Sequence, residues 1–62
     1  MELNNTETHL VLYMARVGSV VANHAMYRHL WYRGLTRWVS PTEMSLSDLG
    51  AREANRLLYN NG

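Results

Sequence analysis

The 62-residue sequence contains no cysteine, no lysine and no phenylalanine, and it has a single proline. Without cysteine, neither a disulfide framework nor a cysteine-based zinc site can stabilise so short a chain. No apolar run approaches the roughly 20 residues of a membrane span. Glu2 and Glu7 stand where a signal peptide would carry basic residues. These absences predict a single cytoplasmic domain, 1–62, without a membrane segment.

The composition is that of a folded protein with a small core. Hydrophobic residues make up 47% of the chain and charged residues only 18%, a balance that favours a folded core over disorder. A chain this short buries only about 60% of the surface that its unfolded form exposes. Because self-association would bury more, we expect a homodimer through the first and last helices.

The charges are unevenly placed, although they sum to only +1. No acidic residue occurs between Thr8 and Thr42, and the same stretch contains four arginines and all three histidines. A nearly neutral protein with this distribution can present one basic face to an anionic partner. The alternative is that the arginines are scattered over the surface and only keep the chain in solution.

The first helix is predicted over 3–17. Asn4 and Glu7 have the spacing of a capping box, and an apolar stripe of helical period follows them. The residues of this stripe are Leu10, Tyr13, Met14, Val17 and Val21.

A second helix is predicted over 20–33. Gly18 suits the left-handed position that ends the first helix, and Ser19 can cap the next one. The sequence Arg33-Gly34-Leu35 fits a Schellman-type stop, with an apolar residue after the glycine. The β-branched pair at 20–21 is also compatible with a short extended segment, which leaves the start of this helix open.

A β-hairpin over 36–46 and a helix over 47–59 are predicted next. The hairpin turns at Ser40-Pro41-Thr42-Glu43, where the fixed φ of proline suits the second position. Ser47 is placed to cap the last helix. The buried face of the hairpin would consist of Trp38, Met44 and Leu46. The predicted fold class is α+β, with the order helix, helix, β-hairpin, helix.

Residues 30–58 resemble the second half of a winged helix-turn-helix domain of bacterial repressors. The resemblance depends on Leu30-x-x-Arg33-Gly34-Leu35-x-Arg37, a hairpin, Leu46-Ser47-x-x-Gly50 and a helix ending in Leu57-Leu58. In that family a helix stops at the Gly-Leu pair, the wing follows, and a Leu-Thr-x-x-Gly step begins the next helix. Ser47 stands where threonine is usual. The resemblance implies DNA binding and transcription regulation.

The chain also departs from the complete motif. Gly18 and Gly34 bracket only 15 residues, room for one helix of about 22 Å where a helix-turn-helix needs two. The predicted wing is short, and its turn contains Glu43 but no basic residue. The chain is therefore similar to a reduced winged helix, of the size met among small accessory proteins of bacterial viruses.

The candidate DNA contacts are arginines interleaved with aromatic residues. Guanidinium groups bind phosphates and guanine edges, and exposed rings stack on bases. We assign the contacts to Arg28, Arg33 and Arg37, supported by Arg16 and His24. In the alternative interpretation the two tryptophans fill the core and the arginine stems lie over them.

A protein partner is the rival hypothesis. Tyrosine, tryptophan and arginine dominate interface hot spots, and four tyrosines cannot all fit into so small a core. The candidate interaction surface consists of Tyr27, Tyr32, Tyr13 and Tyr59. The chain would then be a small phage-like inhibitor or adaptor that docks on a larger host enzyme, such as RNA polymerase or a nuclease.

Nothing in the sequence indicates catalysis, a metal or a cofactor. The serines are explained as caps or turn residues, and the four glycines are isolated, so no phosphate-binding loop is present. His24 and His29 are five positions apart, which puts them about 140° apart around a helix. We expect a protein that is not an enzyme and has no metal, cofactor or small-molecule substrate.

Overall fold

The computed structural model describes residues 2–59, which form three helices and three strands. Their order is α1 (Asn5–Val17), β1 (Ser19–Val21), α2 (Ala25–Tyr32), β2 (Thr36–Trp38), β3 (Glu43–Leu46) and α3 (Asp48–Tyr59). The strands form one antiparallel sheet with β3 in the middle, in the order β1-β3-β2. The α+β class is therefore confirmed, with one strand more than the predicted hairpin supplies.

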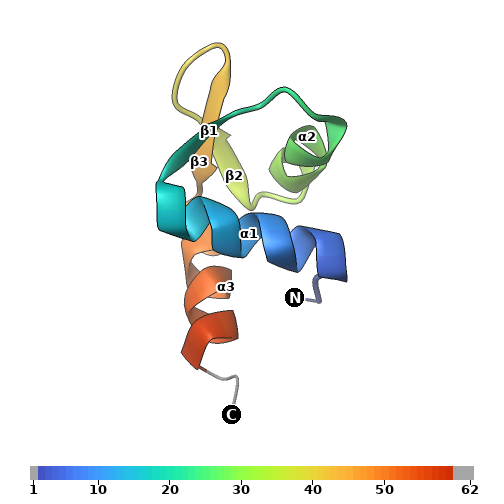
Figure 1. Ribbon diagram of the computed structural model, residues 1–62, viewed down its shortest axis with the longest axis vertical. Coiled ribbons are helices and arrows are strands. Elements are labelled where there is room, and N and C mark those ends of the chain that lie inside the picture. The colour runs from blue at the N-terminus through green and yellow to red at the C-terminus, as the bar shows by residue number, and fades with distance from the viewer. Residues whose placement is uncertain (1, 60–62) are drawn as a thin grey trace.

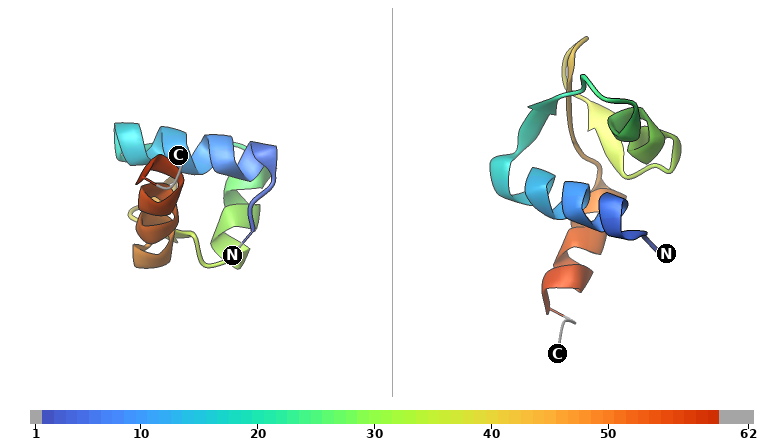
Figure 2. Two further views of the ribbon diagram at one scale, coloured as in Figure 1. Left: turned by 90° about the horizontal axis from the view of Figure 1, so that it is seen from below. Right: turned by 45° about the vertical axis from the view of Figure 1, so that its right-hand side comes forward.

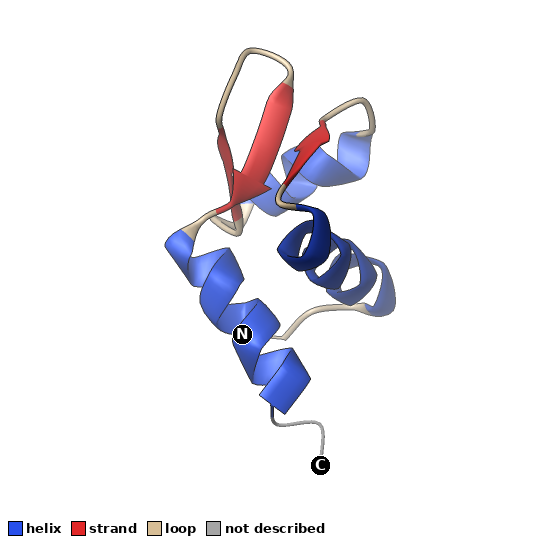
Figure 3. Ribbon diagram, turned by 60° about the vertical axis from the view of Figure 1, so that its left-hand side comes forward, coloured by secondary structure: helices blue, strands red, loops and turns tan. Residues whose placement is uncertain are grey.

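Helix α1 lies across the middle of an elongated molecule of 37 × 18 × 15 Å. The sheet and α2 lie on one side of α1, and α3 extends on the other (Figure 1). Seen from below, α2 lies beside the N-terminal half of α1 and α3 beside its C-terminal half (Figure 2). The hairpin β2–β3 projects beyond the helices, away from the end of α3 (Figures 1 and 3). The molecule therefore has an α2–hairpin end and an α3 end.

The predicted start signal of α1 and the predicted stop signal of α2 are confirmed. Asn4 Oδ1 accepts the Glu7 backbone N–H at 2.8 Å, and the Asn4 N–H donates to Glu7 Oε1 at 2.9 Å. Helix α2 ends in a Schellman motif, because Leu35 N–H donates to Leu30 O and Gly34 N–H to Trp31 O, both at 2.9 Å. Gly34 has a φ of +78° there, which a residue with a Cβ adopts only under strain.

The hairpin has the predicted turn and buried face. Ser40 Oγ accepts the backbone N–H groups of Thr42 and Glu43, at 3.3 and 3.0 Å, and so closes the turn. Trp38 lies opposite Met44 in the register. Met44 is fully buried, and Trp38 packs against the core around it.

The predicted second helix over 20–33 is wrong in its first third. Residues 19–21 form β1, which pairs with β3 so that Val20 faces Met44 in the register, and α2 begins only at Ala25. The β-branched pair takes the extended alternative because β3 offers it a free edge to pair with. Ser19 is consequently a strand residue, and the side chain of His24 caps α2.

The apolar stripe predicted for α1 does not coincide with the side of the helix that is buried. The buried residues of α1 are Glu7, Val11 and Met14, whereas Tyr13 and Val17 are exposed. The cause is Glu7, a buried charged residue that a search for apolar periodicity does not count. The core is completed by single residues from the other segments: Leu30, Leu35, Met44 and Ala54. No helix within residues 2–59 is long and apolar enough to cross a membrane.

Gly50 lets α3 approach the end of α2 closely. Ser47 Oγ accepts the Gly50 N–H at 3.1 Å, and Ser47 N–H donates to Leu35 O at 3.0 Å. A Cβ added to Gly50 would overlap the Leu35 carbonyl oxygen and lie 3.1 Å from a Leu46 methyl carbon. The first turn of α3 is thus packed against backbone that has little freedom to move.

We expect Gly50→Ala to destabilise the fold. The substitution gains about 1 kcal/mol of helix propensity, but overpacking against backbone costs about 2–3 kcal/mol, so the overlap decides the sign. Equilibrium urea unfolding measures the difference, with the exposed substitution Asn55→Ala on the same helix as the control. A Gly50→Ala protein at least as stable as the wild type would contradict this packing.

Candidate nucleic-acid interface

The interface begins with the way α2 is held against α1. Leu30 is fully buried on one side of this eight-residue helix, and Tyr27 is half-buried beside the core. His29 on α2 and Arg33 at its C-cap both reach the carboxylate of Glu7 on α1. Because one side of α2 is fixed at these points, the other side has a defined direction.

The Glu7 carboxylate joins the two helices and caps one of them. Arg33 Nη1 lies 2.7 Å from both Glu7 oxygens, and His29 Nε2 lies 3.3 Å from Oε2. Arg33 Nη2 also donates to the Glu2 carbonyl oxygen at 2.9 Å. Within residues 2–59 every buried side-chain nitrogen or oxygen has a hydrogen-bond partner. The charge of Glu7, which is 2% exposed, is therefore fully compensated.

These contacts stabilise the ionised form of the carboxylate. The Arg33 guanidinium and, after it, the Asn4 N–H hold the pKa of Glu7 below its ordinary range, against the opposing effect of burial. With both oxygens held by Arg33, Glu7 serves as a structural anion between two helices.

The outer face of α2 carries Arg28 and Tyr32, one helical turn apart. Both are exposed, Tyr32 to 76%, and Arg28 makes no ion pair with any described residue. They line an open hollow of about 560 Å3 together with Asn4, Ala25, Met26 and His29. None of these lining residues is acidic. An anion would therefore meet a guanidinium and an aromatic ring without a competing carboxylate in the hollow.

An aromatic cluster continues this face toward the hairpin. We use this name for Trp31, Tyr32 and Trp38. The Trp31 ring lies 5.2 Å from that of Tyr32 and packs edge-on against that of Trp38, with centroids 6.4 Å apart. Trp31 is 42% exposed. Trp38 packs against the core and Trp31 does not, so the alternative in which both tryptophans fill the core holds only for Trp38.

The structure places the five predicted DNA-contacting residues on different surfaces. Arg28 lies on α2, and His24 is the N-cap of that helix, where its Nδ1 accepts the Met26 N–H at 3.2 Å. Arg33 is engaged by Glu7. Arg37 alternates with Thr36 and Trp38 on β2, so it lies on the outer face of the sheet. Arg16 lies on α1, 5.8 Å from the centroid of the Tyr13 ring. The acid-free stretch thus folds into several basic surfaces, of which α2 carries one.

The four predicted tyrosines are also separated. Tyr27 packs partly on the core, Tyr32 is on the α2 face, Tyr13 is on α1 and Tyr59 is 82% exposed near the end of α3. A single surface formed by all four is therefore not present in the chain.

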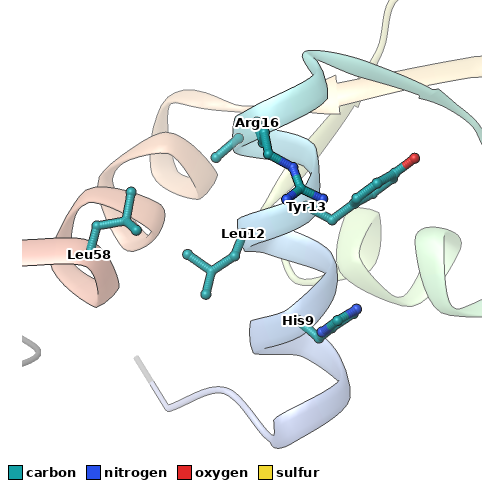
Figure 4. Close-up of a pocket in the computed structure, with 6 residues that line it drawn as sticks. His9, Leu12, Tyr13, Arg16 and Leu58 are labelled. Atoms are coloured by element: carbon teal, nitrogen blue, oxygen red, sulfur yellow. The ribbon is translucent and has the colours of Figure 1, made fainter.

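A groove between α1 and α3 is a second candidate surface. It has a volume of about 460 Å3 and is lined by His9, Leu12, Tyr13, Ala15, Arg16 and Leu58. Leu12 and Leu58 point toward one another across it (Figure 4). Leu58 remains 57% exposed although α1 and α3 pack together. The groove is therefore apolar, with cationic or titratable side chains only from α1.

Sequence reasoning identified Glu7 only as part of the capping box, and it missed the ion pair of Glu7 with Arg33, the contact of His29 with Glu7 and the exposure of Trp31. One signal was available for the first two, since His29 and Arg33 are four residues apart and face the same way on a helix. Such a pair suits a single acid on a facing helix. No local signal indicates that Trp31 stays exposed, because that depends on how β2 is packed.

Residues 2–59 contain no group of three or more His, Asp or Glu side chains able to hold a metal ion. Comparison of the chain with protein-family models, with curated proteins and with solved structures gives no significant match. The functional interpretation therefore depends on the geometry alone.

The Glu7 network predicts a pH-dependent stability. A pKa lowered by folding stabilises the native state above the unfolded pKa, and this contribution is lost as the pH falls through the native pKa. Glu7→Gln keeps the shape and the capping box, and we expect it to cost about 2 kcal/mol at neutral pH. The cost should disappear in acid.

Urea unfolding from neutral pH down to about pH 3 measures this loss. Glu53, whose pKa is lowered by Arg56, is present in both proteins, so their difference reports Glu7 alone. Glu2→Gln, at an exposed side chain, is the control. Parallel pH profiles for wild type and Glu7→Gln would contradict a stabilising charge at Glu7.

Proposed function

We propose that this protein is a small, non-catalytic DNA-binding domain, winged-helix-like and regulatory, that contacts the phosphate backbone through the arginine-bearing face of α2. The observation that carries the proposal is the outer face of α2. There Arg28 and Tyr32 are exposed, without an acidic partner, on a helix anchored from behind by Leu30 and the Glu7–Arg33 ion pair.

The arrangement of α2 and the hairpin supports the winged-helix part of the proposal. The hairpin β2–β3 follows α2 directly and projects beyond the helices, as a wing would (Figure 3). Helix α2 takes the place of the recognition helix, and residues 22–24 replace the helix that would precede it. An α-helix with its side chains is about 10–12 Å in diameter, which fits a major groove about 12 Å wide.

The charges support an anionic ligand. Glu7, an acid that contacts α2, is already used, since it binds His29 and Arg33. Arg28 is left as the cation of the outer face, and guanidinium groups form paired hydrogen bonds with phosphate oxygens. One arginine gives weak attachment, so a second copy of the chain would strengthen binding considerably.

The proposal is tested by fluorescence anisotropy with labelled mixed-sequence DNA, single-stranded and duplex, at two salt concentrations. We expect binding that weakens with salt, and Arg28→Ala should lower affinity and reduce the slope of log affinity against log salt by about 1. Arg52→Ala, at an exposed arginine of α3, is the matched control. Binding of neither DNA, or binding unaffected by salt and by Arg28→Ala, would contradict the proposal.

The groove between α1 and α3 favours a second candidate function, the docking of a protein. Its walls are mainly apolar, and Leu58 and Tyr13 are exposed at its sides. The occupant is either a second copy, as expected from the small core, or a host enzyme that the protein inhibits or recruits.

For the self-association we expect Leu58→Asp to convert a dimer into a monomer, because the charge would be buried in the interface. Equilibrium sedimentation at tens of micromolar measures this. Val39→Asp, at an exposed apolar residue of the hairpin turn, should leave the dimer intact. A wild-type protein that is a stable monomer at that concentration would exclude the homodimer.

A further inference from the structure

The exposed aromatic side chains of α2 lie at its C-terminal end, which is the end that a duplex-reading helix uses least. In helix-turn-helix proteins, base edges are contacted by the N-terminal residues of the recognition helix. Here the first two residues of α2 are Ala25 and Met26, whose side chains have no strong hydrogen-bonding groups, and the Nδ1 of His24 is used to cap the helix. The side chains of residues 24–26 offer base edges only the Nε2 of His24, so direct reading of base pairs has few donors and acceptors at this position.

The hairpin adds little to duplex binding. Its turn is Ser40-Pro41-Thr42-Glu43, which carries no cation, and Glu43 Oε1 accepts from Ser40 Oγ at 3.3 Å. Arg37 lies on the outer face of the sheet, opposite the side on which Trp38 meets α2. A wing of this composition offers the duplex backbone no arginine beside α2.

The C-terminal turn of α2, by contrast, exposes rings beside a cation. Tyr32 is 76% exposed and Trp31 42%, and Arg28 precedes them by four and three positions, so all three lie on neighbouring parts of the helix surface. Tyr32 belongs both to the aromatic cluster and to the hollow lined by Arg28. A flat ring and a guanidinium at this spacing suit a base and its phosphate.

We infer that the site takes single-stranded DNA, with unpaired bases stacked on Tyr32 and Trp31 and a phosphate bound by Arg28. Stacking on a protein ring requires a base with a free face, and in a duplex both faces are covered by neighbouring base pairs. Exposed rings along a cationic surface are how proteins hold single strands without reading sequence. This inference rests on the proposed DNA-binding function and specifies its substrate.

The first experiment compares oligo(dT) with a duplex of the same length by fluorescence anisotropy at low salt. We expect the single strand to bind at least about fivefold more tightly, since base stacking on an aromatic ring contributes to that complex alone. Equal or tighter binding of the duplex overturns the inference and leaves the proposed function intact. Failure of both DNAs to bind overturns both, and the aromatic cluster then fits a protein hot spot.

Substitutions at Tyr32 separate stacking from charge. Tyr32→Ala should weaken oligo(dT) binding about tenfold and change duplex binding little, whereas Tyr32→Phe keeps the ring and should retain the affinity. Tyr59→Ala is the matched control, because Tyr59 is similarly exposed at the other end of the molecule. Oligo(dT) affinity that is unchanged in Tyr32→Ala contradicts stacking on this ring.

Tryptophan fluorescence provides a readout that does not depend on affinity. In a Trp38→Phe protein the emission comes from Trp31 alone, since the chain has two tryptophans. Saturating oligo(dT) should quench and shift this emission, because a stacked base replaces water on the ring. Binding of oligo(dT) without any change in Trp31 emission shows that the strand lies elsewhere and overturns the inference.

Discussion

The ion pair between Glu7 and Arg33 is the interaction on which the geometry of this protein depends. Among residues 2–59 the core contains only six buried apolar residues, and α2 contributes one of them, Leu30. With Leu30, the partly buried Tyr27 and the Trp31–Trp38 contact alone, an eight-residue helix would keep some freedom to rotate about its own axis. The two 2.7 Å contacts of Arg33 with the Glu7 carboxylate remove that freedom. The ion pair therefore helps to set the direction in which Arg28 and Tyr32 point.

The same carboxylate also begins α1, which links local structure to tertiary structure. Glu7 Oε1 accepts the Asn4 N–H as part of the capping box, and the same oxygen lies within reach of Arg33. Burying a charge is costly, and a well-packed apolar residue would often serve stability equally well. An apolar residue, however, would not fix the direction from which Arg33 approaches. We interpret the buried charge as a device that sets the orientation of α2 as well as its attachment.

The parts of the fold that sequence could predict are those decided within a few residues. The Asn4–Glu7 capping box, the Gly34 helix stop, the Ser40 turn and the Ser47 cap all depend on bonds to near neighbours in the chain. Strand β1 depends on a partner more than 20 positions away, since Val20 faces Met44, and local helix propensity could not reveal it. The grouping of the candidate site residues could not be predicted for the same reason, because the ion pair that engages Arg33 joins residues 26 positions apart. Charge counted along the chain located the basic region but not the faces into which it is divided.

The small core also explains why two separate surfaces remain available. Trp31 and Tyr32 are exposed at the α2–hairpin end, and Leu58 and Tyr59 at the α3 end, so one core cannot cover both groups. The two surfaces differ in chemistry: rings beside Arg28 at one end, and an apolar groove at the other. These surfaces would act together if the groove paired two copies, because each copy would still present its α2 face. Two weak phosphate contacts on one strand would then reinforce each other through their effective concentration. A chain too small to build one strong site would in this way obtain it from two weak ones.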